Sequence, residues 1–401
     1  MRTAHVIGVG MTPFTKPGES SADYPELAGA AISEALQDAG IEYPHIEQAL
    51  VGYVHADSTA GQRALYGLGR TGIPVLNVNN NCASGSSALF AARQLVEGGA
   101  ADCVLAVGFE KMKPGSLGNM AYPDIASPVQ PFLEVAARHR PASGAPPMLE
   151  LFRNAGLEHQ ERFGTTAEQF GKVAEKNHRH SAKNPRAQFR TVYSLDEIMG
   201  STQVCDMLTK LQCSPTSDGS AAAIVASEDF VAKYGMENRA VHIAGQALTT
   251  DTAETFESES AFDVVGRDAS RRAANEVYER TGLGPVDLDV IELHDCFSIN
   301  ELLLYEALGL CAEGEGGRLA DDGATTYGGR WVVNPSGGLI SKGHPLGATG
   351  LAQCAELVWQ LRGEAGDRQV AGARTALSHN HGLGSACVVT LYQGPRAGGA
   401  A

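Results

Sequence analysis

Cys82 stands where a nucleophile would be expected. It follows the polar run "NVNNN" and precedes the small-residue stretch "ASGSSALFAARQLVEGG", so we expect it between a strand and a helix. Unpaired N–H groups and the positive end of a helix dipole stabilise a thiolate there. Such a setting can lower a thiol pKa from about 8.5 into the range of about 3.5–7.5. A small buried core cysteine explains the position equally well.

His344 is the candidate base. It lies in "NPSGGLISKGHPLGATG", residues 334–350, and the proline that follows excludes it from a helix interior. A histidine beside a thiol can take the thiol proton and so activate it. A loop histidine is more often a simple hydrogen-bonding group, so this role depends on His344 lying opposite Cys82.

Two further stretches place polar residues at strand ends. In "VIELHDCF", residues 290–297, a buried strand ends in His294, Asp295 and Cys296, and open α/β sheets bind ligands at such ends. A capping Asp295 and a core Cys296 remain the structural alternative. In "SHNHGLGS", residues 378–385, a polar turn contains Asn380 and Gly382, and a glycine N–H of this turn can help to bind an oxyanion. No spaced Cys/His quartet is present, so we expect no metal site.

An internal repeat predicts how these residues are positioned. A shift of 262 residues aligns the stretch from Cys82 with the stretch from His344, and a shift of 242 residues aligns residues 35–51 with residues 277–293. Each pair of stretches shares glycines and an expected helix. We therefore expect an α/β protein of two duplicated halves, with His344 opposite Cys82.

The chain between the halves differs in composition. Residues 115–217 begin with proline- and glycine-rich segments and continue with helical ones, which is typical of an inserted loop domain. We predict an N-terminal half formed by residues 1–114 plus 218–238, the insertion at 115–217, and a C-terminal half at 239–401.

Composition excludes several classes of function. A net charge of −15 without a basic cluster argues against nucleic-acid binding. No apolar run reaches the length of a membrane span. Eight scattered cysteines and the absence of a secretory signal favour reduced thiols and a cytoplasmic location. The "GLGRTG" segment, residues 67–72, precedes a strand, which is the wrong context for dinucleotide binding.

Taken together, these stretches resemble the thiolases, most closely the type that in animals is fused to sterol carrier protein. The resemblance also includes "CVLAVGFEKM" and "LQCSPTSDG", and it extends from residue 1 to about residue 394, without the lipid-carrier domain. It implies the thiolase fold, with α-β-α-β-α layers and an inserted loop domain. It also implies a homodimer or homotetramer that binds acyl-CoA and free CoA as substrates and holds no tightly bound cofactor.

The resemblance further implies a role for each candidate. Cys82 would carry the acyl group, His344 would activate it, and Cys296 would move the proton of the acetyl-CoA enolate. His294 and His344 would hold the enolate oxygen, and the N–H groups of Cys82 and Gly382 would form a second oxyanion site. Asn380 occupies the turn where other thiolases place their second cysteine. The implied activity is cleavage of 3-oxoacyl-CoA in fatty-acid or sterol side-chain β-oxidation.

Some points depart from the family pattern or stay open. His381 and Ser385 replace residues that the closer group would have as aliphatic and glycine, so the acyl pocket is expected to differ. Residues 176–190 form a basic stretch that is either a CoA phosphate contact or a solvated helix face. Two rival functions are a retro-aldolase subunit that needs a partner protein and a non-catalytic acyl-CoA-binding protein.

Overall fold

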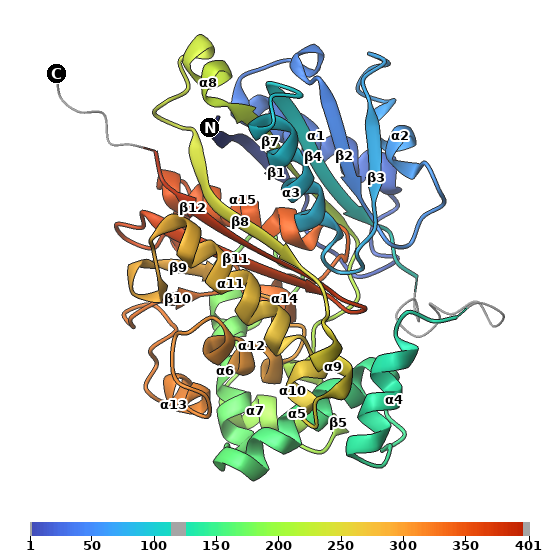
Figure 1. Cartoon of the computed structure of the whole chain (residues 1–401), viewed down its shortest axis with the longest axis vertical. Coiled ribbons are helices and arrows are strands. Elements are labelled where there is room, and N and C mark those ends of the chain that lie inside the picture. The colour runs from blue at the N-terminus through green and yellow to red at the C-terminus, as the bar shows by residue number, and fades with distance from the viewer. Residues whose placement is uncertain (1, 114–125, 396–401) are drawn as a thin grey trace.

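The computed structural model describes residues 2–113 and 126–395 (Figure 1). The predicted domain boundary at residues 114 and 115 lies outside the described residues. Within the described ranges, no helix is both long and apolar enough to cross a membrane.

One ten-stranded sheet is built from two halves of the same design. The strand order of the first half is β3-β2-β4-β7-β1, and that of the second half is β8-β12-β11-β9-β10. The first half contains β1 (Ala4–Met11), β2 (Gln48–Gly52), β3 (Val75–Val78), β4 (Cys103–Glu110) and β7 (Gly219–Ser227). The second contains β8 (Val241–Thr249), β9 (Val290–Glu292), β10 (Val332–Val333), β11 (Thr375–Gly382) and β12 (Ala386–Gln393). Read outward from the β1–β8 junction, the two orders match strand for strand, which confirms the duplication.

The halves join edge to edge and also share a central helical layer. Strands β1 and β8 pair antiparallel through His5 with His242 and Val6 with Val241. Helices α3 (Ser84–Glu97) and α15 (Thr349–Arg362) pack on each other, and α15 contacts β7 of the first half and β11 of the second (Figure 1). Their apolar side chains form one core with strands of both halves. Helix α1 (Tyr24–Ala39) covers the first half, and α11 (Arg267–Thr281) covers the second.

Equivalent helices end in the same way. Gly40 caps the C-terminus of α1 and Gly282 caps that of α11, and both glycines have φ of 68°, in the left-handed region that favours glycine. A short 3₁₀ turn and a strand follow each glycine, at Tyr43–His45 before β2 and at Pro285–Asp287 before β9. These are the stretches that the 242-residue shift aligns.

The inserted segment is mostly helical and lies at the lower end of the molecule in Figure 1. It contains α4 (Gln130–His139), α5 (Pro147–Phe163), α6 (Ala167–Ser181), α7 (Leu195–Met199), β5 (Gln203–Cys205) and β6 (Leu208–Thr209). The other helices are α2 (Ala60–Leu65), α8 (Glu228–Tyr234), α9 (Ala253–Glu257), α10 (Ala261–Val264), α12 (Ser298–Ala307), α13 (Gly316–Asp321) and α14 (Gly338–Lys342). The exact boundaries of the predicted halves, at residues 218–238 and 239–401, stay predictions.

Candidate functional site

Cys82 lies in a tight turn between β3 and α3, as expected. Asn81, directly before it, has φ of 48°, which gives the turn a sharp reversal. The Asn81 side chain donates to the carbonyl oxygen of Leu383 in the β11–β12 turn, at 2.5 Å. A Cβ on Gly382 would lie 2.0 Å from the carbonyl oxygen of Asn80, so only glycine lets β11 approach so closely. The predicted Gly382 therefore lies against the Cys82 turn.

The structure brings Cys82, His294 and His344 together. The Cys82 sulfur and one ring nitrogen of each histidine all lie within 4.8 Å of one another. The two imidazole rings meet edge to face, with centroids 5.1 Å apart. Cys82 is half-buried, whereas both histidines are buried. Three segments far apart in the sequence thus converge on one point.

Hydrogen bonds leave one nitrogen of His344 with a free lone pair. The Thr349 hydroxyl donates to the carbonyl oxygen of Pro345 at 3.0 Å, so it accepts from His344 Nδ1–H at 2.7 Å. Nε2 is then unprotonated, and it is buried without a hydrogen-bond partner among the described residues. The backbone N–H of His344 donates to Ser217 Oγ at 2.8 Å and fixes the turn.

His294 shows the opposite arrangement. The Asn380 amide nitrogen donates to His294 Nδ1 at 3.0 Å, and the Asn380 amide oxygen accepts from Ser86 at 2.7 Å. With this orientation of the Asn380 amide, His294 Nε2 carries the proton and is a hydrogen-bond donor. The Asn300 side chain donates to the backbone carbonyl of His294 and holds the strand end in place. Asn380, predicted to bind substrate, contacts His294 and orients it.

Burial keeps the site neutral. It lowers the pKa of His344 to about 3, with nearby Lys342 acting in the same direction. Burial, followed by the charges of neighbouring histidines, lowers the pKa of His294 well below its usual value. Burial raises the pKa of the Cys82 thiol to about 12, and the Glu110 carboxylate adds to this shift. The lowered thiol pKa expected from the helix terminus is wrong for the free protein, because burial raises the pKa of the thiol more than the backbone hydrogen bond lowers it.

Cys296 lies close enough to Cys82 for their charges to interact. Burial raises its thiol pKa well above the usual value, and repulsion from Cys82 is the next largest cause. Its backbone carbonyl accepts from the N–H of Ser214 at 2.9 Å. The thiol is thus protonated and lies within electrostatic range of Cys82.

Asp295 has the helix-capping role that the sequence offered as the structural alternative to ligand binding. Its carboxylate accepts the N–H groups of Leu339 at 2.7 Å and Ile340 at 3.2 Å, and it also accepts from the Asn177 side chain at 2.7 Å. It caps the start of α14, which leads to His344. Burial, followed by repulsion from Glu301, raises its pKa well above the usual value.

Glu110 was missed in the sequence. This buried carboxylate accepts N–H groups from His55 at 2.7 Å, Val54 at 3.2 Å and Gly347 at 2.9 Å. It therefore links the loop after β2 to the chain that leads into α15. Burial raises its pKa to about 7. The available signal was one acidic residue at the end of an otherwise apolar strand.

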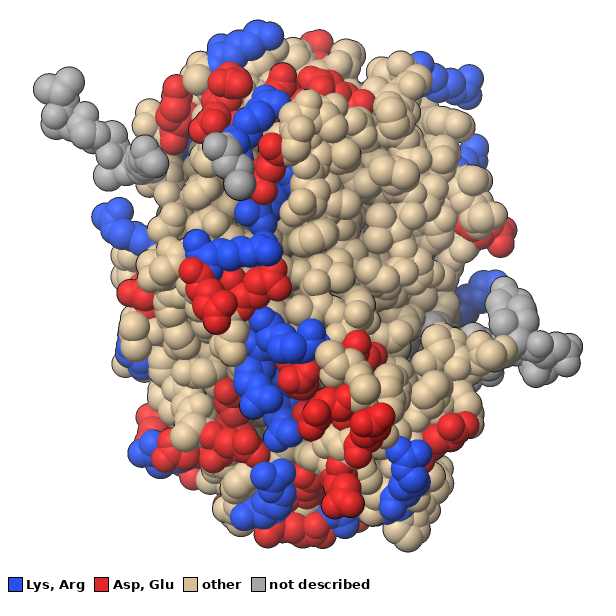
Figure 2. Space-filling view, viewed as in Figure 1, with Lys and Arg blue, Asp and Glu red and all other residues tan. Residues whose placement is uncertain are grey.

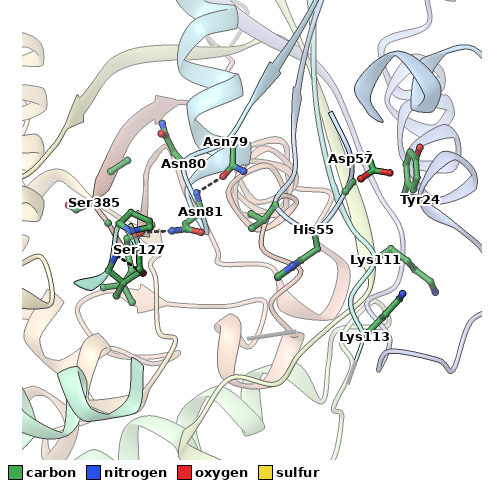
Figure 3. A pocket seen from close by; sticks show the side chains of 18 of the residues that line it. Tyr24, His55, Asp57, Asn79, Asn80, Asn81, Lys111, Lys113, Ser127 and Ser385 are labelled. Carbon is green, nitrogen blue, oxygen red and sulfur yellow. Dashed lines mark hydrogen bonds between the residues drawn. The ribbon is translucent and has the colours of Figure 1, made fainter. Parts of the chain in front are cut away.

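A cavity of about 960 Å³ opens beside the Cys82 turn. Asn80, Asn81 and Gly382 form part of its wall, and Ser385 is also a lining residue. Figure 3 shows Lys111 and Lys113 on the side of the cavity away from Asn81. His381 lies deeper, with its ring against Gly266 and 6.4 Å from the His294 ring, centroid to centroid.

The basic stretch at residues 176–190 is only partly internal, because Arg179, Lys183 and Arg190 are exposed. Lys176 is buried and pairs with Glu301 at 2.6 Å. His178 and His180 are buried and bond to the carbonyl oxygens of Leu211 and Asn334, both at 3.0 Å. These three side chains form neither an exposed phosphate contact nor a solvated helix face.

Comparison with known proteins gives consistent matches. The model "Thiolase, N-terminal domain" matches residues 4–229, and "Thiolase C-terminal domain-like" matches residues 250–393. "Sterol carrier protein 2" of Rattus norvegicus is 61% identical over 390 residues, which cover 97% of this chain and 71% of that protein. "Acetyl-CoA acetyltransferase" of Methanothermobacter thermautotrophicus is 37% identical over 398 residues, which cover 98% of this chain and all of that protein.

Two solved structures share the fold. The "Ltp2-ChsH2(DUF35) aldolase" has a TM-score of 0.83 at 22% identity, with 98% of each chain covered. Human mitochondrial 3-ketoacyl-CoA thiolase in complex with CoA has a TM-score of 0.72 at 18% identity, also with 98% of each chain covered. At these identities the likeness concerns the fold alone, whereas the two family models together span most of the sequence. The chain belongs to the thiolase family of acyltransferases.

Proposed function

We propose that this protein is a 3-ketoacyl-CoA thiolase that acts through an acyl group on Cys82. It would cleave 3-oxoacyl-CoA with CoA to give acetyl-CoA, or propionyl-CoA, and a shortened acyl-CoA. The observation that carries this proposal is the placement of Cys82 beside His344, whose Nε2 is buried without a partner among the described residues. Names of relatives support a role in lipid metabolism, and β-oxidation of fatty acids or sterol side chains is the proposed setting.

In the first half-reaction the Cys82 thiol passes its proton to His344 Nε2 and attacks C3 of the substrate. The N–H groups of Cys82 and Gly382 hold the resulting oxyanion. The C2–C3 bond then breaks, and its electron pair forms the acetyl-CoA enolate. The Nε2–H groups of His294 and of protonated His344 hold the enolate oxygen. Cys296 gives a proton to C2 and becomes a thiolate.

In the second half-reaction the Cys296 thiolate takes the proton of free CoA. The CoA thiolate attacks the acyl group, and Cys82 leaves as a thiolate that recovers its proton from His344. Every group returns to its starting state. The same steps run backwards in condensation, because the proton donors of one direction are the acceptors of the other.

Mass spectrometry tests the proposal. The protein is incubated with acetoacetyl-CoA or a longer 3-oxoacyl-CoA, without free CoA, and its peptides are compared with those of Cys82→Ala. We expect the Cys82 peptide to gain the mass of the shortened acyl group, and Cys82→Ala to gain none. Binding of both substrates without an adduct would reject the proposal in favour of the non-catalytic or partner-dependent alternatives.

The retro-aldolase alternative has one supporting observation, the aldolase complex among the structures that share the fold. That reaction would depend on a second protein, whereas the thiolase mechanism uses only residues of this chain. Acyl transfer to Cys82 by the isolated protein therefore separates the two.

We further propose that the protein forms homodimers, or homotetramers, through the β3 edge of the sheet. Leu76 on β3 is 52% exposed, and Tyr66 nearby in the sequence is 51% exposed. Figure 2 shows few charged side chains over the part of the surface where Figure 1 places α3, β2 and β3. All eight cysteines are free, which supports the proposed reducing, cytoplasmic location.

A further inference from the structure

We propose that Cys82, His294 and His344 also bind Zn²⁺, so that free zinc reversibly inhibits the protein. This inference goes beyond the proposed activity and rests on the arrangement of three donor atoms. One thiol and two imidazoles are the ligand types that zinc prefers, and open zinc sites use three protein ligands. The sequence did not predict it, because the three residues lie in separate segments and lack zinc-finger spacing.

The distances require only local movement. The three donor atoms lie within 4.8 Å of one another. Tetrahedral zinc with bonds of about 2.0–2.3 Å needs donor separations of roughly 3.3–3.6 Å. Shifts of the donor atoms by about an ångström close this gap, through rotation of the Cys82 side chain about its single χ1 bond and of the two imidazole side chains about their own rotatable bonds.

The hydrogen-bond partner of the His344 ring also suits metal binding. Histidines that bind metal hold their other ring nitrogen in a hydrogen bond, which fixes the ring. His344 Nδ1 donates to Thr349, and its free Nε2 is buried and unpaired among the described residues. This is the second, independent sign of a ligand site, since a buried lone pair without a partner costs free energy.

His294 becomes a metal ligand if the Asn380 amide turns over. The amide oxygen would then accept from His294 Nδ1–H, and the amide nitrogen would donate to Ser86 Oγ. The Ser86 hydroxyl could in turn donate to the carbonyl oxygen of Ala83, which is already 3.0 Å away. The hydrogen bonds that join His294, Asn380 and Ser86 are all kept, and His294 Nε2 gains a free lone pair.

Binding would join zinc to the Cys82 sulfur and release the thiol proton to solvent, with no change of oxidation state. The metal would occupy the nucleophile, the base and one oxyanion donor together. Inhibition should therefore be complete, competitive with 3-oxoacyl-CoA, and reversed by a chelator.

Cobalt spectroscopy tests the site without any substrate, so the result stands apart from the thiolase assay. Co²⁺ is titrated into the full-length protein while the thiolate-to-metal charge-transfer band is followed, and Zn²⁺ affinity is measured against a chromophoric chelator. We expect a single saturable site. Cys82→Ser should abolish the band. His294→Asn should weaken binding by at least about 10- to 100-fold, the loss that removal of one outer partner causes.

Cys311→Ser is the matched control, because this half-buried thiol lies outside the three-residue cluster. It should leave the band and the affinity unchanged. No saturable binding, or a charge-transfer band that persists in Cys82→Ser, would overturn the inference. A band lost in Cys311→Ser instead would place the metal elsewhere and would also overturn it.

Discussion

At the scale of single residues, Cys82 and His344 form a neutral thiol–imidazole pair in the free protein. The same loss of water raises the pKa of the thiol and lowers that of the imidazole. In the proposed mechanism the thiolate therefore forms as the carbonyl carbon is attacked, when His344 takes the proton. A resting ion pair is not needed for this chemistry, and burial disfavours it.

Alkylation of Cys82 provides a test of this neutral pair. Because the thiol pKa is raised to about 12, the thiolate fraction should grow about tenfold for each pH unit between pH 7 and 9. The rate of iodoacetamide labelling of the Cys82 peptide, measured by mass spectrometry in the absence of substrate, should therefore also rise about tenfold for each pH unit. A rate that is already constant above pH 7 would instead indicate a resting thiolate–imidazolium pair.

At the scale of elements, glycines let the two central helices and their strands meet. A Cβ on Gly85 of α3 would lie 2.5 Å from the carbonyl oxygen of Gly347, two residues before the start of α15. A Cβ on Gly347 would in turn lie 2.5 Å from the carbonyl oxygen of Phe109 in β4. These obstacles are backbone atoms, so they cannot move aside as a flexible side chain can. The close packing of α3 on α15 therefore sets the separation of Cys82 and His344.

Replacing Gly85 by alanine should reduce stability. Overpacking of a close contact typically costs about 1–3 kcal/mol, which exceeds the gain of about 0.5–1 kcal/mol in helix propensity. Urea denaturation should show a lower free energy of unfolding. Gly29→Ala in α1 is the matched control, because apart from the backbone of its own helix no atom lies within 4 Å of the added Cβ, and it should stabilise the protein by about 0.5–1 kcal/mol. Equal behaviour of the two variants would contradict the packing argument.

At the scale of the whole molecule, the exposed β3 edge is the predicted contact between subunits. Unpaired N–H and C=O groups at a sheet edge invite pairing with another chain, and Leu76 adds apolar area. Leu76→Arg should therefore shift sedimentation toward the monomer. Val286→Arg, at a 73% exposed position in the second half, should leave the assembly unchanged. Sedimentation of Leu76→Arg identical to that of the unmodified protein would place the interface elsewhere.

The sequence by itself determined the fold class and most of the candidate site. The internal repeat predicted equivalent halves, because similar sequences at a helix end and at the start of the next strand produce similar local structure. Cys82 and His344 could be paired because they precede equivalent helices, α3 and α15. The His-Asn-His triplet was placed only approximately, because residues 379–381 lie within β11 and the turn begins after Gly382.

Only the tertiary structure decided the protonation states and the supporting contacts. The pKa of Cys82 depends on burial by chain segments far away in the sequence, which a local helix-dipole argument omits. Glu110, Thr349 and Ser86 have ordinary sequence contexts, and their partners become visible once the chain has folded. Local patterns specify local elements, whereas desolvation and the choice of histidine tautomer arise from contacts between those elements.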